Sequence, residues 1–196
     1  MTRILAFSDV HLGRGRIRAI VEAGKDADLV IGAGDFCNMR QGLGEAMDLL
    51  WTLADKAIYV PGNAESAGEL RAATEATVLH GGSTEVHDLT IWGIGYAIPV
   101  TPFGDWSCDL TEEAAAAMLA PMDGADILIS HSPPKGIADI GRDGRSLGST
   151  AVRGAIERVQ PRLCVCGHIH DCWGQTGQIG QTRIVNLGPT PNWFEF

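Results

Sequence analysis

Side chains of the types that bind divalent metals follow five short apolar runs of this sequence. The residues are aspartates, an asparagine and histidines, each one to three positions beyond the end of its run: Asp9, His11, Asp35, Asn63, His131, His168 and His170. Carboxylate, amide and imidazole ligands without a thiolate suit hard or borderline metals such as manganese, iron or zinc. The sequence therefore predicts a metal site assembled from distant parts of the chain.

The apolar runs are the elements that must position these side chains. Continuous runs of valine, isoleucine and leucine are typical of strands that are buried on both faces. They occur at residues 3–8, 28–34, 57–62, 127–130 and 163–167. In open α/β sheets the binding crevice lies just outside the carboxyl ends of the strands, so we expect the side chains to converge at one edge.

The remaining segments predict a layered arrangement. Apolar residues at helical spacing favour helices at 16–25, 43–54, 66–73, 111–122 and 149–159. Alternating patterns and glycine turns favour antiparallel strands at 77–80, 84–87 and 89–94, and a last hairpin from 173–175 and 182–187. Strand–helix alternation followed by strand pairs predicts a layered α/β domain, with two sheets packed face to face and helices outside.

The ordered motifs resemble those of one protein family. Asp9-Val10-His11, Gly34-Asp35, Gly62-Asn63, His131 and Gly167-His168-Ile169-His170 resemble the motifs of calcineurin-like metallophosphoesterases, over nearly the whole chain. The small size and the stretch from Ser130 to Gly136 are similar to the compact bacterial and archaeal members of phosphodiesterase type. The resemblance implies a four-layer α/β/β/α sandwich of two mixed β-sheets flanked by helices.

The resemblance also implies two bound divalent metal ions, with manganese as the first choice and iron, zinc or nickel as alternatives. One ion would be bound by Asp9, His11 and His170, and the other by Asn63, His131 and His168. Asp35 would bridge both, because a carboxylate offers two oxygens. Asp35, Asn63 and His131 are accordingly the expected catalytic residues. The implied activity is phosphoester hydrolysis, first of phosphodiesters, by in-line attack of a hydroxide that bridges the two metals.

One position departs from the family pattern. In much of the family a histidine follows the asparagine and is often assigned as the general acid, whereas this chain has Ala64. A methyl group cannot donate a proton, and general acid catalysis typically contributes about 10²–10⁴ in rate. Glu65 would lose its histidine partner, and we interpret it as a carboxylate at a helix N-terminus. His80 and His87 could reach the site, but we interpret both as surface or core-edge residues.

Charge and composition limit the partners. The net charge of −9 argues against a nucleic-acid partner, which would require a basic surface, and so against a nuclease. A small phosphorylated substrate is compatible with this net charge. Arg142 and Arg145, in a glycine-rich loop, are candidates for binding it. Each arginine by itself is more often a solvated surface charge. A non-catalytic metal-binding scaffold is a further alternative, against which the full set of metal ligands argues.

Length and cysteine content complete the expectations. The 196 residues fit a single metallophosphoesterase domain, 1–196. No stretch approaches the roughly 20 apolar residues that span a bilayer, so we expect no membrane partner. An odd number of cysteines, five, and the absence of an apolar signal region favour the cytoplasm. Cys164 and Cys166 are interpreted as buried strand thiols, although a Cys-x-Cys metal site is an alternative. A homodimer is left open.

Overall fold

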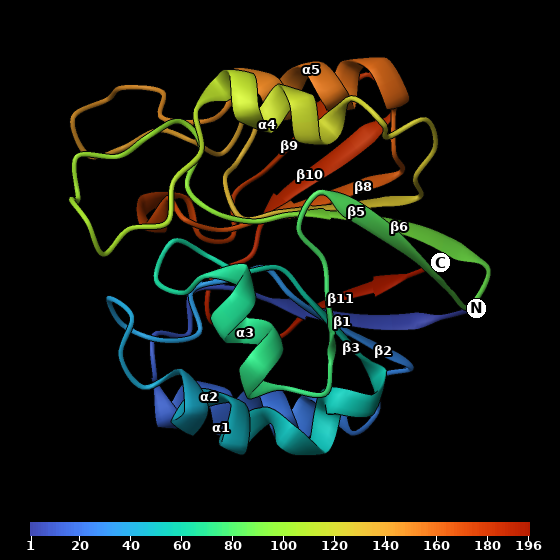
Figure 1. Cartoon of the computed structure of the whole chain (residues 1–196). Coiled ribbons are helices and arrows are strands. Elements are labelled where there is room, and N and C mark those ends of the chain that lie inside the picture. The colour runs from blue at the N-terminus through green and yellow to red at the C-terminus, as the bar shows by residue number, and fades with distance from the viewer.

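Two β-sheets packed face to face form the centre of the computed structural model, which describes residues 1–196 (Figure 1). Helices cover the outer face of each sheet, so that the molecule has four layers. The mixed α/β architecture predicted from the sequence is confirmed. No helix combines the length and the apolar character needed to cross a membrane.

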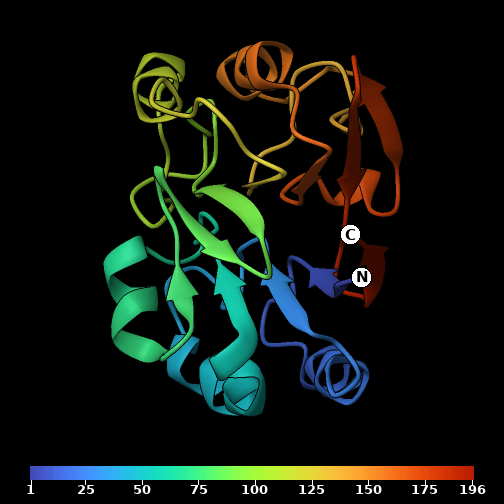
Figure 2. The same ribbon diagram turned by 90° about the vertical axis from the view of Figure 1, so that its right-hand side faces the viewer.

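The first sheet contains the strands of the amino-terminal half together with the last strand. Its order is β11-β1-β2-β3-β4. The strands are β1 (Arg3–Phe7), β2 (Leu29–Gly32), β3 (Ala57–Tyr59), β4 (Thr77–Val78) and β11 (Asn192–Glu195). All neighbours pair in parallel except β11, which runs antiparallel to β1 and brings the two chain ends together (Figure 2). The amide of Thr2 accordingly donates to the carbonyl of Phe196 at 2.7 Å.

The second sheet contains the strands of the carboxyl-terminal half, in the order β5-β6-β7-β8-β10-β9. The strands are β5 (Gly82–Val86), β6 (Leu89–Ile94), β7 (Ile127–Ser130), β8 (Leu163–Cys166), β9 (Thr176–Ile179) and β10 (Thr182–Asn186). The four central strands are parallel, and the two edge strands pair antiparallel with their neighbours. The carboxyl ends of the central strands therefore share one edge of the sheet.

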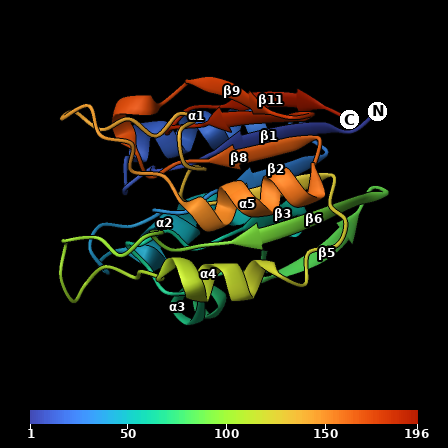
Figure 3. The same ribbon diagram turned by 90° about the horizontal axis from the view of Figure 1, so that it is seen from above.

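The helices connect the parallel strands and cover their outer faces. On the first sheet lie α1 (Arg14–Gly24), α2 (Leu43–Leu50) with its 3-10 extension η1 (Trp51–Lys56), and α3 (Ala67–Ala73). On the second lie α4 (Glu112–Leu119) and α5 (Thr150–Val159), side by side when seen from above (Figure 3). Three helices begin at hydroxyl side chains that accept a backbone N–H of the first turn, as helix caps do: Ser66, Thr111 and Ser149.

Three apolar cores lie between the four layers. Because side chains alternate along a strand, Ile4 of β1 faces the other sheet, whereas its neighbour Leu5 faces the helices. The core between the sheets contains residues of both, and each outer core joins one sheet to its helices. Burial of both faces explains why the strands that precede the predicted ligands are continuous apolar runs. The strands are thus held at fixed positions beneath the loops that follow them.

The prediction of an antiparallel pair between residues 77–80 and 84–87 is wrong. β4 instead pairs in parallel with β3, in the first sheet, and β5 begins the second sheet. The chain crosses between the sheets at Leu79, which is buried in the core between them, and turns at Gly81, whose φ is +74°. The prediction failed because a hairpin and a crossing between sheets have the same sequence pattern, an apolar segment followed by a glycine turn. In the last hairpin the first strand, β9, begins and ends later than expected, whereas β10 begins at Thr182 as expected, with the turn at Gly180.

Candidate metal centre

The predicted ligands lie in loops at one edge of the molecule, directly beyond the carboxyl ends of the strands. The loops after β1, β2 and β3 belong to the first sheet, and those after β7 and β8 to the second. Together they bring into one region all seven side chains: Asp9, His11, Asp35, Asn63, His131, His168 and His170. Each sheet contributes part of the constellation, so the packing of the two sheets sets its geometry.

Tight backbone turns hold these loops close together. Asp9, Asp35 and His168 have positive φ values of 53°, 57° and 65°, in the left-handed region that side chains other than glycine seldom adopt. Glycines precede the ligands because neighbouring loops touch there. A Cβ at Gly62 would collide with Asp35, and a Cβ at Gly167 would collide with the Asp9 carboxylate. The Gly-Asn and Gly-His motifs are therefore requirements of close packing.

One group of ligand atoms contains Asp9, His11, Asp35 and His170, all within 4.8 Å of one another. The Nε2 atoms of His11 and His170 are 3.2 Å apart. His11 Nε2 is also 3.4 Å from Asp35 Oδ2, and His170 Nε2 is 3.7 Å from Asp9 Oδ1. Two carboxylates and two imidazoles thus surround one point.

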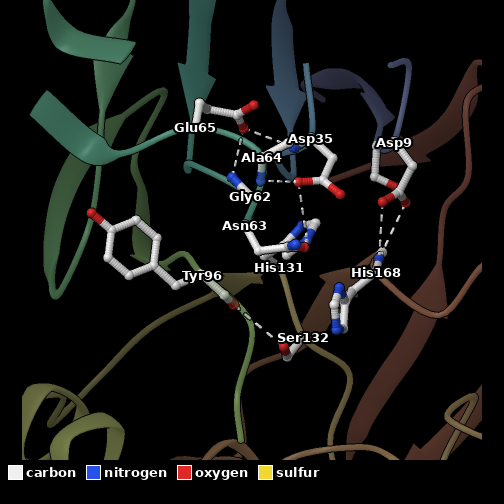
Figure 4. A network of polar contacts seen from close by, with 12 residues as sticks. Asp9, Asp35, Gly62, Asn63, Ala64, Glu65, Tyr96, His131, Ser132 and His168 are labelled. Atoms are coloured by element: carbon white, nitrogen blue, oxygen red, sulfur yellow. Dashed lines mark hydrogen bonds and ion pairs between the residues drawn. The ribbon is translucent and has the colours of Figure 1, made fainter. Parts of the chain in front are cut away.

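A second group contains Asp35, His131 and His168, also within 4.8 Å. His131 Nε2 is 3.5 Å from Asp35 Oδ1 and 3.2 Å from Asn63 Oδ1. Asp35 therefore belongs to both groups: its Oδ2 faces His11, and its Oδ1 faces His131 (Figure 4). This is the arrangement that a carboxylate shared by two metal ions requires.

The ring nitrogens test whether the residues fit a metal. His131 Nδ1 is 2.7 Å from the carbonyl of Ala33, and His11 Nδ1 is 3.0 Å from that of Cys37. A carbonyl only accepts, so each Nδ1 carries the hydrogen, and in the neutral ring Nε2 carries the lone pair. Both Nε2 atoms then face the oxygens of Asp35, which are also acceptors. A cation placed between these atoms would accept their converging lone pairs. The set of ligand atoms therefore fits divalent metal ions.

The electrostatics of the metal-free protein reflect the same convergence. Burial opposes a second proton on His131, but the charges of Asp35 and Asp9 outweigh it and raise the pKa of this imidazole. Burial also opposes ionisation of Asp9, yet its hydrogen bond to His170 and the charge of His131 lower its pKa. Burial, together with the charge of His131, lowers the pKa of His168 to about 3, so His168 is a neutral imidazole. Metal binding would replace the second proton of His131.

Glu65 was misinterpreted from the sequence. It precedes α3 rather than capping it, is fully buried, and accepts hydrogen bonds from four backbone N–H groups (Figure 4). The donors are Asp35 at 2.8 Å, Phe36 at 3.1 Å, Cys37 at 3.3 Å and Gly62 at 2.7 Å. Burial, and secondly the Asp35 charge, raise the pKa of Glu65 to about 7. Its carboxyl group joins the loop of Asp35 to the loop of Asn63.

Two further residues beside the ligands were missed in the sequence. Trp173 Nε1 donates to Asp9 Oδ2 at 3.2 Å, and its ring packs 4.4 Å from the ring of His170. Ser107 Oγ accepts from Asn63 Nδ2 at 3.0 Å, which leaves Asn63 Oδ1 directed at His131. Trp173 could have been suspected from its place three residues after His170, whereas nothing in the sequence near Ser107 indicates its position.

The remaining predicted residues occupy different surroundings. Arg142 Nε lies 3.0 Å from Asp171 Oδ1, beside His170, whereas Arg145 pairs with Asp143 of its own loop. Only Arg142 is thus tied to a neighbour of a ligand. The Ala64 methyl is buried, and its backbone N–H donates to Asp35 Oδ1 at 2.8 Å.

The other two histidines and the strand cysteines belong to neither group of ligand atoms. His80 Nδ1 accepts from the Gly95 amide at 3.1 Å, and His87 is exposed in the turn after β5. Cys164 and Cys166 are fully buried in the core beneath α4 and α5, as interpreted from the sequence. Burial raises the pKa of the Cys164 thiol to about 12, so this cysteine is a protonated core side chain.

Comparisons with solved structures agree with the fold. The protein TT1561 of Thermus thermophilus superposes with a TM-score of 0.76 at 16% identity, over 98% of each chain. A dimetal phosphatase from Danio rerio gives 0.64 at 13% identity, over 96% of this chain and 88% of the other. A novel archaeal phosphodiesterase gives 0.55 at 16% identity, over 95% and 83%. At these identities the similarity concerns the fold.

Sequence comparisons define the family. The Caenorhabditis elegans UPF0046 protein K07C11.7 is 27% identical over an alignment that covers 94% of this chain and 68% of that protein. Human metallophosphoesterase domain-containing protein 1 is 41% identical over 66 residues, and that match spans only 20% of its length. The family described as the calcineurin-like phosphoesterase superfamily domain matches residues 2–194. With a match over almost all of its length, this chain belongs to the calcineurin-like phosphoesterase superfamily.

Proposed function

We propose that the protein is a metal-dependent phosphohydrolase that acts on phosphodiesters through a pair of divalent metal ions. The observation that carries the proposal is Asp35, whose two oxygens face two separate groups of ligand atoms. Membership of the superfamily supports the same reaction class. Manganese is the ion we expect, with iron, zinc and nickel as alternatives.

The bound ions would supply Lewis-acid activation of water and of the phosphoryl group. The chain's own residues hold this chemistry in place. Asp35 fixes the separation of the two groups, and the carbonyl contacts of His11 and His131 fix the tautomers that direct Nε2 inward. Asn63 adds a neutral oxygen, which would leave the net positive charge of its metal-bound group higher than a second carboxylate beside Asp35 would.

The nearby hydroxyl groups are already engaged in structural hydrogen bonds. Ser8 Oγ donates to Asp9 Oδ2 at 2.6 Å, and Ser132 Oγ donates to the carbonyl of Tyr96 at 3.3 Å. Both serines are fully buried. A side-chain nucleophile is therefore not part of the proposed reaction, and we assign the attack on phosphorus to water.

The test uses chelator-treated protein and bis-p-nitrophenyl phosphate, an aryl phosphodiester. We expect hydrolysis to appear when Mn²⁺ is added and to disappear when chelator is restored. A matched control is Trp51→Ala, at an exposed aromatic residue at the start of η1, which should retain full activity. If the protein binds two metals per chain but hydrolyses neither diesters nor monoesters with any of the four metals, the proposal is wrong and the protein is a metal-binding scaffold.

A further inference from the structure

The segment between β6 and α4 carries two stacked aromatic side chains that belong to none of the three cores. The rings of Phe103 and Trp106 have centroids 5.6 Å apart and planes within 7° of parallel. Phe103 is 49% exposed, and Val100 nearby in the chain is 59% exposed. Exposed aromatic side chains that pack on each other outside any core are candidates for a binding site.

Hydrogen bonds to one carboxylate hold together the loop that presents the two rings. Asp109 Oδ2 accepts from the amide of Thr101 at 2.7 Å and from its hydroxyl at 2.8 Å. Asp109 Oδ1 accepts from Ser107 Oγ at 2.6 Å. One carboxylate thereby closes residues 101–109 into a ring of hydrogen bonds, and the aromatic pair lies within it. These hydrogen bonds restrain the backbone that carries the pair, which lowers the entropy lost when a ligand binds.

The same loop is attached directly to the candidate metal centre. Ser107, the neighbour of Trp106, accepts from Asn63 Nδ2, and the amide of Cys108 donates to the Asn63 carbonyl at 2.9 Å. Figures 1 and 3 show the loop, in yellow-green, projecting past the carboxyl ends of the strands, on the side where the ligand loops lie. Trp106 is thus next in sequence to Ser107, which contacts the proposed metal ligand Asn63.

We propose that Phe103 and Trp106 form a stacking subsite for a flat aromatic substituent of the phosphoester substrate, either a nucleobase or a simple aryl group. The inference rests on the proposed function, because it places the substrate phosphate at Asp35 and Asn63. With centroids 5.6 Å apart the near-parallel rings are offset, so each covers only part of one face of the other, and the exposed ring of Phe103 leaves surface on which a third ring can stack. Aromatic stacking accepts any flat π system, so the subsite selects the class of substituent rather than its hydrogen-bonding pattern.

The test measures binding rather than turnover, by calorimetry on Mn²⁺-loaded protein. The ligands are methyl phosphate, phenyl phosphate and thymidine 5′-phosphate, which share a phosphate and differ in the attached group. We expect at least one aromatic ligand to bind about tenfold more tightly than methyl phosphate. Equal gains for both aromatic ligands would identify a general aryl subsite, and a gain for thymidine 5′-phosphate alone would identify a nucleobase subsite.

The double variant Phe103→Ala/Trp106→Ala removes both rings and should bring the affinity ratio of aromatic ligand to methyl phosphate close to one. Trp51→Ala, at an exposed tryptophan on the first sheet's helices, should leave the ratio of the wild type unchanged. A wild type without preference, or a double variant that retains the preference, would overturn the subsite. Failure of bis-p-nitrophenyl phosphate hydrolysis would instead overturn the proposed reaction, and the affinity ratios would still decide the subsite.

Discussion

At the scale of single residues, Asp35 differs from the other proposed ligands because its two oxygens face different imidazoles. Asp9, by contrast, belongs to one group only. We therefore expect Asp35→Asn to abolish phosphodiester hydrolysis and to lower the metal content towards one ion per chain or less. Asp9→Asn should mainly weaken one ion. Metal analysis after gel filtration, with a bis-p-nitrophenyl phosphate assay, measures both. Normal turnover and two ions in Asp35→Asn would contradict the shared carboxylate.

The alanine at position 64 has a consequence for the leaving group. A methyl group cannot donate a proton. Ala64 is also only 1% exposed, so a histidine side chain at this position would displace its neighbours. Without a general acid there, departing alkoxides are left to metal and solvent, and kcat/KM should fall steeply as the pKa of the leaving group rises. A series of diesters from p-nitrophenyl to alkyl esters measures the slope. A flat dependence would show that another group donates the proton.

At the scale of elements, the carboxyl group of Glu65 joins the loop after β2 to the loop after β3. In Glu65→Gln an amide NH₂ replaces one oxygen and faces two backbone N–H groups. Each of the two unsatisfied buried donors costs about 1–3 kcal/mol, so we expect the free energy of unfolding to fall by about 2–6 kcal/mol. Mn²⁺ should also bind more weakly. Urea denaturation with and without Mn²⁺ measures both effects.

The control for this experiment is Glu69, a second glutamate that lies four residues further on, in the first turn of α3. Glu69 caps α3 and pairs with Arg40, but its side chain is 43% exposed. Glu69→Gln should therefore cost less than about 1 kcal/mol and leave metal binding unchanged, because exposed ion pairs contribute little. Equal losses in the two variants would show that the four buried hydrogen bonds of Glu65 contribute no more to stability than the exposed contacts of Glu69.

Elements also show how far the sequence predicts this structure. The ligand motifs were found because each follows a strand that is apolar on both faces, and such strands place their carboxyl ends together. The path of residues 77–82 was not found, because Leu79 is apolar both in a hairpin and in a crossing between sheets. Glu65 was misjudged because its four partners come from two loops that only the packed sheets bring together. Trp173 and Ser107 depend on the same long-range packing.

At the scale of the whole molecule, the segment that crosses between the sheets makes stability depend on pH. Burial, and secondly the charge of Arg71, lower the pKa of His80 from 6.5 to about 4. The unfolded chain therefore takes up a proton before the folded protein does. The contribution of neutral His80 to stability is fully present above pH 6.5 and is lost as the pH falls towards 4.

His80→Phe tests this dependence, because phenylalanine retains a ring against Tyr96, whose centroid lies 4.3 Å away, but cannot take up a proton. We expect the melting temperature of metal-free wild type to fall more steeply between pH 6.5 and pH 4 than that of the variant. The difference between the two curves isolates His80 from the carboxyl groups that also titrate there. Parallel curves would show that the environment of His80 does not oppose protonation.

The left-handed backbone at Asp9, Asp35 and His168 lowers the stability of the fold at three positions that the proposed metal site requires. Each such residue costs roughly 1–2 kcal/mol that glycine would not. Glycine at these positions would relieve the backbone and at the same time delete a proposed ligand. Selection for robustness alone would remove these side chains, and so would a screen that rewards only thermal tolerance. Under the proposed function, the backbone strain in these three loops is retained because the side chains bind metal, at some cost in stability.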